Sequence, residues 1–172
     1  MQALAPLMQS FTQLKSLQEL NGAYRTVIPG VKFYRAGTSS RREPLLYQSG
    51  IIVMGQGRKN IYIADNCLQY GPGDYLVLGV PMPLECEAFT ENGLPIMGLA
   101  IDVDSHTLHK LVGQINQQDK QANSVSENDK NLLDFGVKSN SACEDFNSTI
   151  MRLLKVLHKD VEAAILGPAI VE

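Results

Sequence analysis

IIVMGQGRKNIYIADNCLQYGPGDYLVLGV, residues 51–80, is the stretch that decides the fold. Apolar and polar residues alternate within it, and turn-forming residues separate the alternating runs. The apolar positions are rich in β-branched and aromatic residues, which favour strands. Asp65-Asn66 predicts a two-residue hairpin turn, because both residues tolerate a positive φ. Gly71-Pro72-Gly73-Asp74 predicts a second turn.

The period of two extends outward from this stretch, to about Tyr24 on one side and Val103 on the other. Pro81 and Pro83 restrict their stretch to an edge strand or a bulge. Asn92-Gly93 indicates a further turn. About seven or eight short strands at this spacing predict a sandwich or a barrel. The predicted strands are Val31–Ala36, Ile51–Gly55, Asn60–Ala64, Cys67–Tyr70, Tyr75–Val80, Leu84–Phe89 and Ile96–Asp102.

Helical spacing flanks the strands. Apolar residues recur every three or four positions over Leu4–Leu14. After the strands, Asp104 or Ser105 is predicted to cap a helix that runs to about Gln118. Residues 117–130 are polar without an apolar period and predict a loop. We therefore expect an α+β fold, mainly β, with the N-terminal helix and the strands in residues 1–103 and a helical segment in residues 104–172.

A later helix is predicted from Ser141 to about Lys159. Ser141 and Glu144 fit a capping box, in which each side chain accepts a hydrogen bond from the other residue's backbone N–H. Gly167-Pro168 is expected to break the helical pattern. The apolar stripe of this helix consists of Phe146, Ile150, Leu153, Leu154 and Leu157.

This helix is also the predicted self-association surface. Met151 and Val156 lie off the stripe, so the second face is less polar than a solvated face. We expect an isologous two-fold homodimer, and the alternative is that the stripe only covers the strands. The predicted dimerisation residues are Phe146, Ile150, Met151, Leu154 and Leu157.

The bulk composition bounds the class of protein. The chain has 172 residues, of which 44% are hydrophobic and 19% charged, as expected for one globular domain. Its net charge of −3 argues against direct nucleic-acid binding by this segment. Cys67, Cys86 and Cys143 are far apart and odd in number, which indicates reduced thiols in a cytoplasmic protein. The N-terminus lacks the basic residues of a signal peptide, and no apolar run has the ~20 residues of a membrane helix.

Enzyme motifs are missing from the sequence. His106, His109 and His158 all lie in predicted helices, and a surface pair is the favoured reading of the first two. No G-x-S-x-G motif occurs, and the segment Gly55–Lys59 lacks the spacing of a phosphate loop, so a β-turn is favoured there. We therefore expect no catalytic residue, no metal and no cofactor.

Four residues are candidates for a small-molecule pocket. Arg35 shares its parity with Val31 and Phe33, and an inward guanidinium needs a partner. A structural pair with Glu43 or Asp74 is the alternative to a ligand contact. Parity and polarity also single out three companions, for which core filling is the alternative. The candidate ligand-binding residues are Arg35, Tyr47, Met54 and Gln56.

Several strings, in this order and spacing, resemble the N-terminal domain of AraC-type bacterial transcriptional regulators. They span roughly residues 10–172. The strings are Gly22-Ala23-Tyr24-Arg25-Thr26, Ile28-Pro29-Gly30-Val31, Phe33-Tyr34-Arg35, Glu43-Pro44, Gln56-Gly57-Arg58-Lys59, Tyr70-Gly71-Pro72-Gly73-Asp74-Tyr75-Leu76, Val80-Pro81-Met82-Pro83 and Leu166-Gly167-Pro168.

The resemblance implies a cupin-like double-stranded β-barrel that binds a small-molecule effector, followed by helices that dimerise. It also implies two helix-turn-helix units, which we expect to follow the end of this chain, so that DNA is contacted only through them. The alternatives are a small metal-free cupin enzyme, isomerase-like in reaction, and a stand-alone binding barrel.

Overall fold

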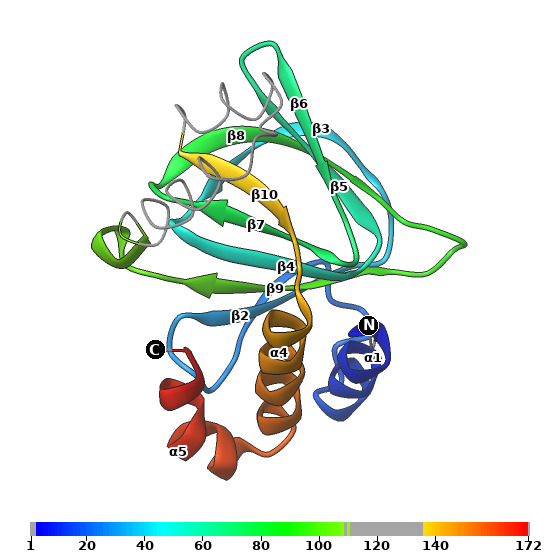
Figure 1. Ribbon diagram of the computed structural model, residues 1–172. Helices are drawn as coiled ribbons and strands as arrows, with labels where there is room; N and C mark the ends of the chain where they lie inside the picture. Colours follow the sequence, from blue (N-terminus) through cyan, green and yellow to red (C-terminus); the bar gives the residue numbers. More distant parts are fainter. Residues whose placement is uncertain (1–2, 109, 111–135, 172) are drawn as a thin grey trace.

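The computed structural model describes residues 3–108, 110 and 136–171. Two antiparallel sheets face each other in the described part of the chain (Figure 1). The six-stranded sheet has the order β1 (Gly22–Arg25), β2 (Val31–Ala36), β9 (Ile96–Asp102), β4 (Gly50–Gln56), β7 (Asp74–Leu78) and β10 (Val137–Ser141). The four-stranded sheet has the order β3 (Ser40–Tyr47), β8 (Met82–Phe89), β5 (Arg58–Ile63) and β6 (Asn66–Tyr70).

Three helices form a layer beneath the six-stranded sheet, as Figure 1 shows. They are α1 (Ala5–Leu14), α4 (Glu144–Leu157) and α5 (Asp160–Val171). Glu144 and Asp145 lie in the first turn of α4, where carboxylates interact favourably with the helix dipole. The mainly β fold with N-terminal and C-terminal helices is therefore confirmed. The two sheets remain separate and do not close into one barrel.

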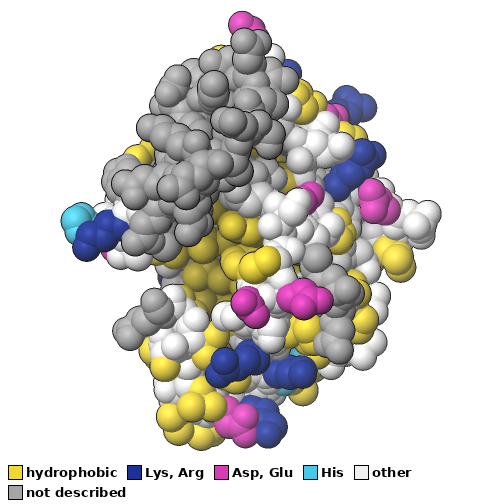
Figure 2. Space-filling model, viewed as in Figure 1, with side chains coloured by type: hydrophobic (Ala, Val, Ile, Leu, Met, Phe, Trp, Pro, Cys, Tyr) yellow, Lys and Arg dark blue, Asp and Glu magenta, His cyan; other side chains and the backbone are white. Residues whose placement is uncertain are grey.

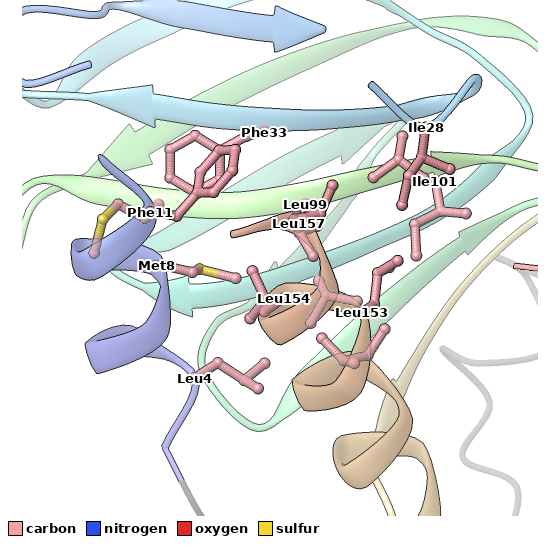
Figure 3. Packing of buried hydrophobic residues seen from close by; sticks show 14 of the residues in the cluster. Leu4, Met8, Phe11, Ile28, Phe33, Leu99, Ile101, Leu153, Leu154 and Leu157 are labelled. Atoms are coloured by element: carbon pink, nitrogen blue, oxygen red, sulfur yellow. The ribbon is translucent and has the colours of Figure 1, made fainter. Parts of the chain in front are cut away.

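The six-stranded sheet is buried on both faces, and each face has its own hydrophobic core. Strand β4 shows this directly, because Ile51 and Val53 pack toward the helices whereas Ile52 and Met54 pack between the sheets. Figure 3 shows the helix-side core, in which Met8 and Phe11 of α1 and Leu154 of α4 meet the sheet. Because both of its faces are apolar, β4 carries an unbroken apolar run at Ile51–Met54 in place of strict alternation.

Three strands were not among those predicted: β1, β3 and β10. Each is the outermost strand of its sheet. Edge strands carry more polar and charged side chains than central strands do. β3 in particular contains Arg41, Arg42 and Glu43, followed by Pro44, which tolerates an edge position. The weak periodicity of edge strands explains why the pattern missed them.

Three local predictions were wrong. The hairpin turn between β5 and β6 is Ala64-Asp65, one residue earlier than expected, with Ala64 at φ 50°. Ser141 does not form a capping box, because it ends β10 in register with Asp74; Cys143 is the N-cap of α4 and makes no side-chain cap hydrogen bond. Pro168 does not break α5, which continues to Val171.

The helix predicted from Asp104 begins as expected. The Thr107 backbone N–H donates to Asp104 Oδ1 over 3.0 Å, which is an N-cap contact. Most of that helix, and the polar loop at residues 117–130, lie outside the described residues.

Candidate effector pocket

A cavity of about 320 Å³ lies between the two sheets, toward the β1–β2 side of the sandwich. This volume is at the lower end of the range of small-molecule sites. Strands β2, β4 and β9 supply one wall, and β3 and β5 supply the other. The apolar side chains on its walls include Leu45, Leu46, Ile52, Met54 and Ala100.

The cavity reaches solvent beside an ion pair. Lys32 Nζ lies 3.0 Å from Asp102 Oδ2, and both residues line the cavity. Leu46, also in the lining, is 64% exposed and lies at the rim of the cavity.

Lys59 is the buried cation of this cavity. It is 5% exposed, shares the inward face of β5 with Ile61 and Ile63, and has its Nζ 3.9 Å from the centroid of the Tyr34 ring. Burial lowers the pKa of Lys59. No carboxylate of the described residues lies within ion-pair distance of it. A desolvated cation–π contact stabilises by about 2 kcal/mol, which does not offset the several kcal/mol of burying an ammonium.

Gly57 directs Lys59 inward. This glycine connects β4 of one sheet with β5 of the other and has φ +76°. A Cβ atom there would lie 2.9 Å from the Phe89 carbonyl oxygen, so only glycine fits the crossing. The tight crossing leaves Arg58 on the outer face, with its Nε 3.2 Å from Glu91 Oε1, and Lys59 on the inner face.

Two tyrosine hydroxyls lie in the same interior. Tyr47 lines the cavity, and Tyr70 packs in the same core. The two hydroxyls and the Cys86 thiol lie close enough to affect one another's pKa, although neither hydroxyl makes a hydrogen bond of good geometry within the described part of the chain. Burial raises the pKa of both hydroxyls, so both are neutral at pH 7.

The structure brings only two of the four predicted pocket residues to the cavity, Tyr47 and Met54. Gln56 lies at the bulge between β4 and β9, and its Nε2 donates to the Pro95 carbonyl over 2.7 Å. Arg35 is placed elsewhere too. Its Nη1 donates to the Leu20 carbonyl over 3.1 Å, in place of a carboxylate.

The prediction that Arg35 faces the sandwich interior needs correction. Arg35 shares its parity with Val31 and Phe33, as predicted, but both of these residues pack in the helix-side core. The opposite face of β2 carries Tyr34 and packs between the sheets. Parity was therefore correct, and the choice of which face looks inward was wrong.

Lys59 and Tyr34 were missed as pocket residues. The predicted strand began at Asn60, although Lys59 continues the alternation of Ile61 and Ile63 by one step. A lysine on an apolar parity was the signal in the sequence. Tyr34 could not be identified from the sequence. It alternates with apolar residues, and such a position can face either solvent or a second hydrophobic core.

The predicted dimerisation stripe is buried within this chain. Ile150, Leu154 and Leu157 are at most 3% exposed in the helix-side core. Phe146 stacks on Tyr75 of β7, with ring centroids 4.2 Å apart. Met151 packs against the same core and is partly buried. These side chains cover the sheet, which was the stated alternative.

Helix α5 exposes apolar side chains. Val161 is 74% exposed, Ile165 70% and Leu166 49%. Figure 2 shows hydrophobic side chains at the lower end of the molecule, where α5 lies in Figure 1. A second apolar area occupies a hollow near the centre of the same view.

No three His, Cys, Asp or Glu side chains of the described ranges are grouped so that they could hold a metal ion. Within those same ranges, no helix is long and apolar enough to cross a membrane.

Residues 27–172 match the family model described as "AraC-type transcriptional regulator N-terminus". None of the curated protein sequences compared with the chain matches it. Among solved structures, the chain is similar to the protein YhaK from Escherichia coli (13% identity, 64% of this chain and 40% of that chain, TM-score 0.34). It is also similar to apo ToxT from Vibrio cholerae (7% identity, 83% and 55% covered, TM-score 0.39). A cupin-2 domain protein from Shewanella frigidimarina is similar at 14% identity, with 57% and 98% covered and a TM-score of 0.36.

Proposed function

We propose that this chain, which belongs to the AraC-type transcriptional regulators, is both the effector-sensing domain and the dimerisation domain of such a regulator. The cavity between the sheets is the effector site. The protein acts in the cytoplasm, has no catalytic role, and reaches DNA through a separate helix-turn-helix domain. The chain spans 40% and 55% of the lengths of YhaK and ToxT.

The observation that carries this proposal is the position of the cavity relative to the helices. Ile52 and Met54 of β4 line the cavity, whereas Val53, which lies between them in the sequence, packs in the core between the sheet and α4. Tyr75 of β7 is paired with Val53 and stacks on Phe146 of α4. A ligand that shifts β4 therefore has a route of direct contacts to the helical layer, with no intervening loop.

A coupling of this kind requires a difference in affinity. A ligand changes the arrangement of the helices only if it binds one arrangement more tightly than another. A coupling of about 1–3 kcal/mol is typical of allosteric proteins, which corresponds to a change in affinity of roughly 5- to 150-fold.

Self-association is the second part of the proposal, and α5 is the surface we assign to it. The α4 stripe is occupied by the chain's own core, whereas Val161, Ile165 and Leu166 of α5 are exposed. An isologous contact between two copies of α5 would bury these side chains in a two-fold dimer.

Hydrogen exchange is the experiment that tests the sensing function. A thermal-shift screen of metabolites first identifies compounds that stabilise the native state. Exchange of the α4 and α5 amides is then measured with and without each binder. We expect protection to change in the helices as well as in β3 and β4. A change confined to the strands around the cavity would leave a binding barrel without regulation.

A further inference from the structure

We propose that the cavity takes a small apolar monocarboxylate and that Lys59 holds its carboxylate. This inference deepens the proposed function and rests on it only in treating the cavity as the effector site. It depends on two properties of the described residues: a buried cation without an acidic partner among them, and apolar walls.

Lys59 has no acidic partner among the described residues. Lys15, Lys32 and Lys159 each form an ion pair, with the Nζ atom within 3.0 Å of an acidic side chain. Lys59 is far more buried than any of these, at 5% exposed, and its contact is an aromatic ring. A buried ammonium without an anion destabilises a protein, and a bound anion relieves that cost. The anion is therefore assigned to the ligand.

The number of unpaired cations on the cavity wall limits the charge that a ligand can carry. Lys59 lines the cavity and supplies one positive charge. The other cation of the lining, Lys32, is already paired with Asp102. One positive charge suits a monoanionic carboxylate, whereas a dianionic phosphate would leave a net negative charge buried.

The walls define the rest of the ligand. Leu45, Leu46, Ile52 and Met54 present hydrocarbon to the cavity. The volume of about 320 Å³ corresponds to roughly ten water-sized volumes of about 30 Å³ each. A carboxylate with a short alkyl chain or a single aromatic ring matches this size, and its apolar body would extend from Lys59 toward the rim at Leu46.

The test is isothermal titration of this chain with two matched pairs of compounds. Octanoate is compared with octanamide, and 4-ethylbenzoate with 4-ethylbenzamide, so that the members of each pair share their apolar body and size and differ in the charge of the head group. The expected result is binding of the acids at one site per chain, roughly ten- to hundredfold tighter than binding of the amides, as for a hydrogen bond to a charged group. Lys59→Met should abolish this preference, and Lys59→Arg should keep it.

Several outcomes would overturn the assignment. Equal affinity for acid and amide, or a preference for the acid that survives in Lys59→Met with its fold intact, would show that Lys59 does not read charge. Failure of both acids to bind while the amides, 1-octanol or octylamine bind would also overturn it, although effector sensing would stand. Failure of every compound in the panel and in the metabolite screen would count against both proposals.

A covalent outcome is distinguished separately. Octanal is added with borohydride, and the modified residues are mapped by mass spectrometry. Selective reduction of an imine onto Lys59, together with no binding of the acids, would mean that Lys59 serves as a neutral amine toward carbonyl compounds, and the carboxylate assignment would be wrong.

Discussion

Lys59 and Tyr34 face each other from opposite sheets, with Lys59 Nζ 3.9 Å from the centroid of the Tyr34 ring. Lys59 belongs to β5 of the four-stranded sheet and Tyr34 to β2 of the six-stranded sheet. The contact therefore spans the interior beside the cavity. Among the described residues, it places the one buried lysine where a ligand entering between the sheets would meet it.

Removing the buried charge should not destabilise the protein. We expect Lys59→Met to leave the free energy of unfolding unchanged or to raise it by up to about 4 kcal/mol, because methionine fills a similar volume without the desolvation cost. Denaturant unfolding of the ligand-free protein measures this. The control is Lys32→Met at the exposed pair with Asp102, where a change within about 0.5 kcal/mol is expected. A clear loss of stability in Lys59→Met alone would mean that Lys59 is structural.

The stability of the ligand-free protein should rise with pH below about pH 10. Burial lowers the pKa of Lys59 from 10.5, so between the lowered pKa and 10.5 the unfolded state binds more protons than the folded state. Stability then increases with pH across that window. The affinity for a carboxylate should fall across the same window, since Lys59 loses its charge.

Other titratable groups face Lys59, and the experiment has to separate them. Burial raises the pKa values of Tyr34, Tyr47 and Tyr70 above 10.0, so these residues reduce stability only above about pH 10. Cys86 is also close to Lys59, so Cys86→Ala is introduced both into the wild-type protein and into Lys59→Met. Thermal unfolding between about pH 7 and about pH 9 is then compared with and without Lys59→Met. Equal slopes would show that Lys59 does not titrate in this range.

Filling the cavity should block binding without disturbing the fold. Ala100 lines the cavity from β9 and is partly exposed, so Ala100→Phe would occupy part of the space that a ligand needs. We expect loss of binding for every compound found in the thermal-shift screen, with a stability change below about 1.5 kcal/mol because the added ring enters existing space. Ala23→Phe, at an exposed position of β1, tests whether a ring at the rim has the same effect. Unchanged binding in Ala100→Phe would place the effector site elsewhere.

Substitutions in α5 should affect self-association, whereas substitutions in the core of α4 should affect stability. Ile165→Glu, at a side chain 70% exposed, is expected to weaken the dimer at least tenfold with little change in stability. Leu154→Ala, in the helix-side core at 0% exposed, should cost about 2–5 kcal/mol of stability. Sedimentation velocity at tens of micromolar and denaturant unfolding give the two readouts. If the wild-type protein is a monomer and Ile165→Glu leaves its sedimentation unchanged, α5 is not a dimer surface.

A side chain at Gly167 should destabilise the protein. A Cβ atom there would overlap Ile28 Cδ1, so Gly167→Ala forces either the buried Ile28 side chain or α5 to shift. We expect a loss of roughly 1–3 kcal/mol, the usual cost of overpacking. Gly79→Ala is the matched control, because a Cβ atom at Gly79 meets only the Gly136 carbonyl oxygen at 3.5 Å. Equal stability of the two variants would show that α5 is loosely held at this end.

Much of the architecture followed from the sequence alone. The alternation in residues 51–80 and its extension predicted the central strands, because a residue's parity on a strand is a local property of the backbone. The predicted strand Leu84–Phe89 shows this alternation in the structure, where Leu84 and Cys86 are buried and Glu85 between them is exposed. The family resemblance predicted the class of regulator to which the chain belongs.

Only the tertiary structure decided which face of each strand looks into the cavity. Phe33 and Tyr34 are neighbours on β2, and both faces of that strand are covered, one by helices and one by the second sheet. Parity shows that the two residues lie on opposite faces of the strand. It does not show which face is covered by the helices and which by the second sheet. That choice depends on where α1 and α4 pack, and these helices are joined to the sheet by contacts between residues far apart in the chain. For this reason Arg35 was expected inside and Lys59 was not, and the structure places them the other way round.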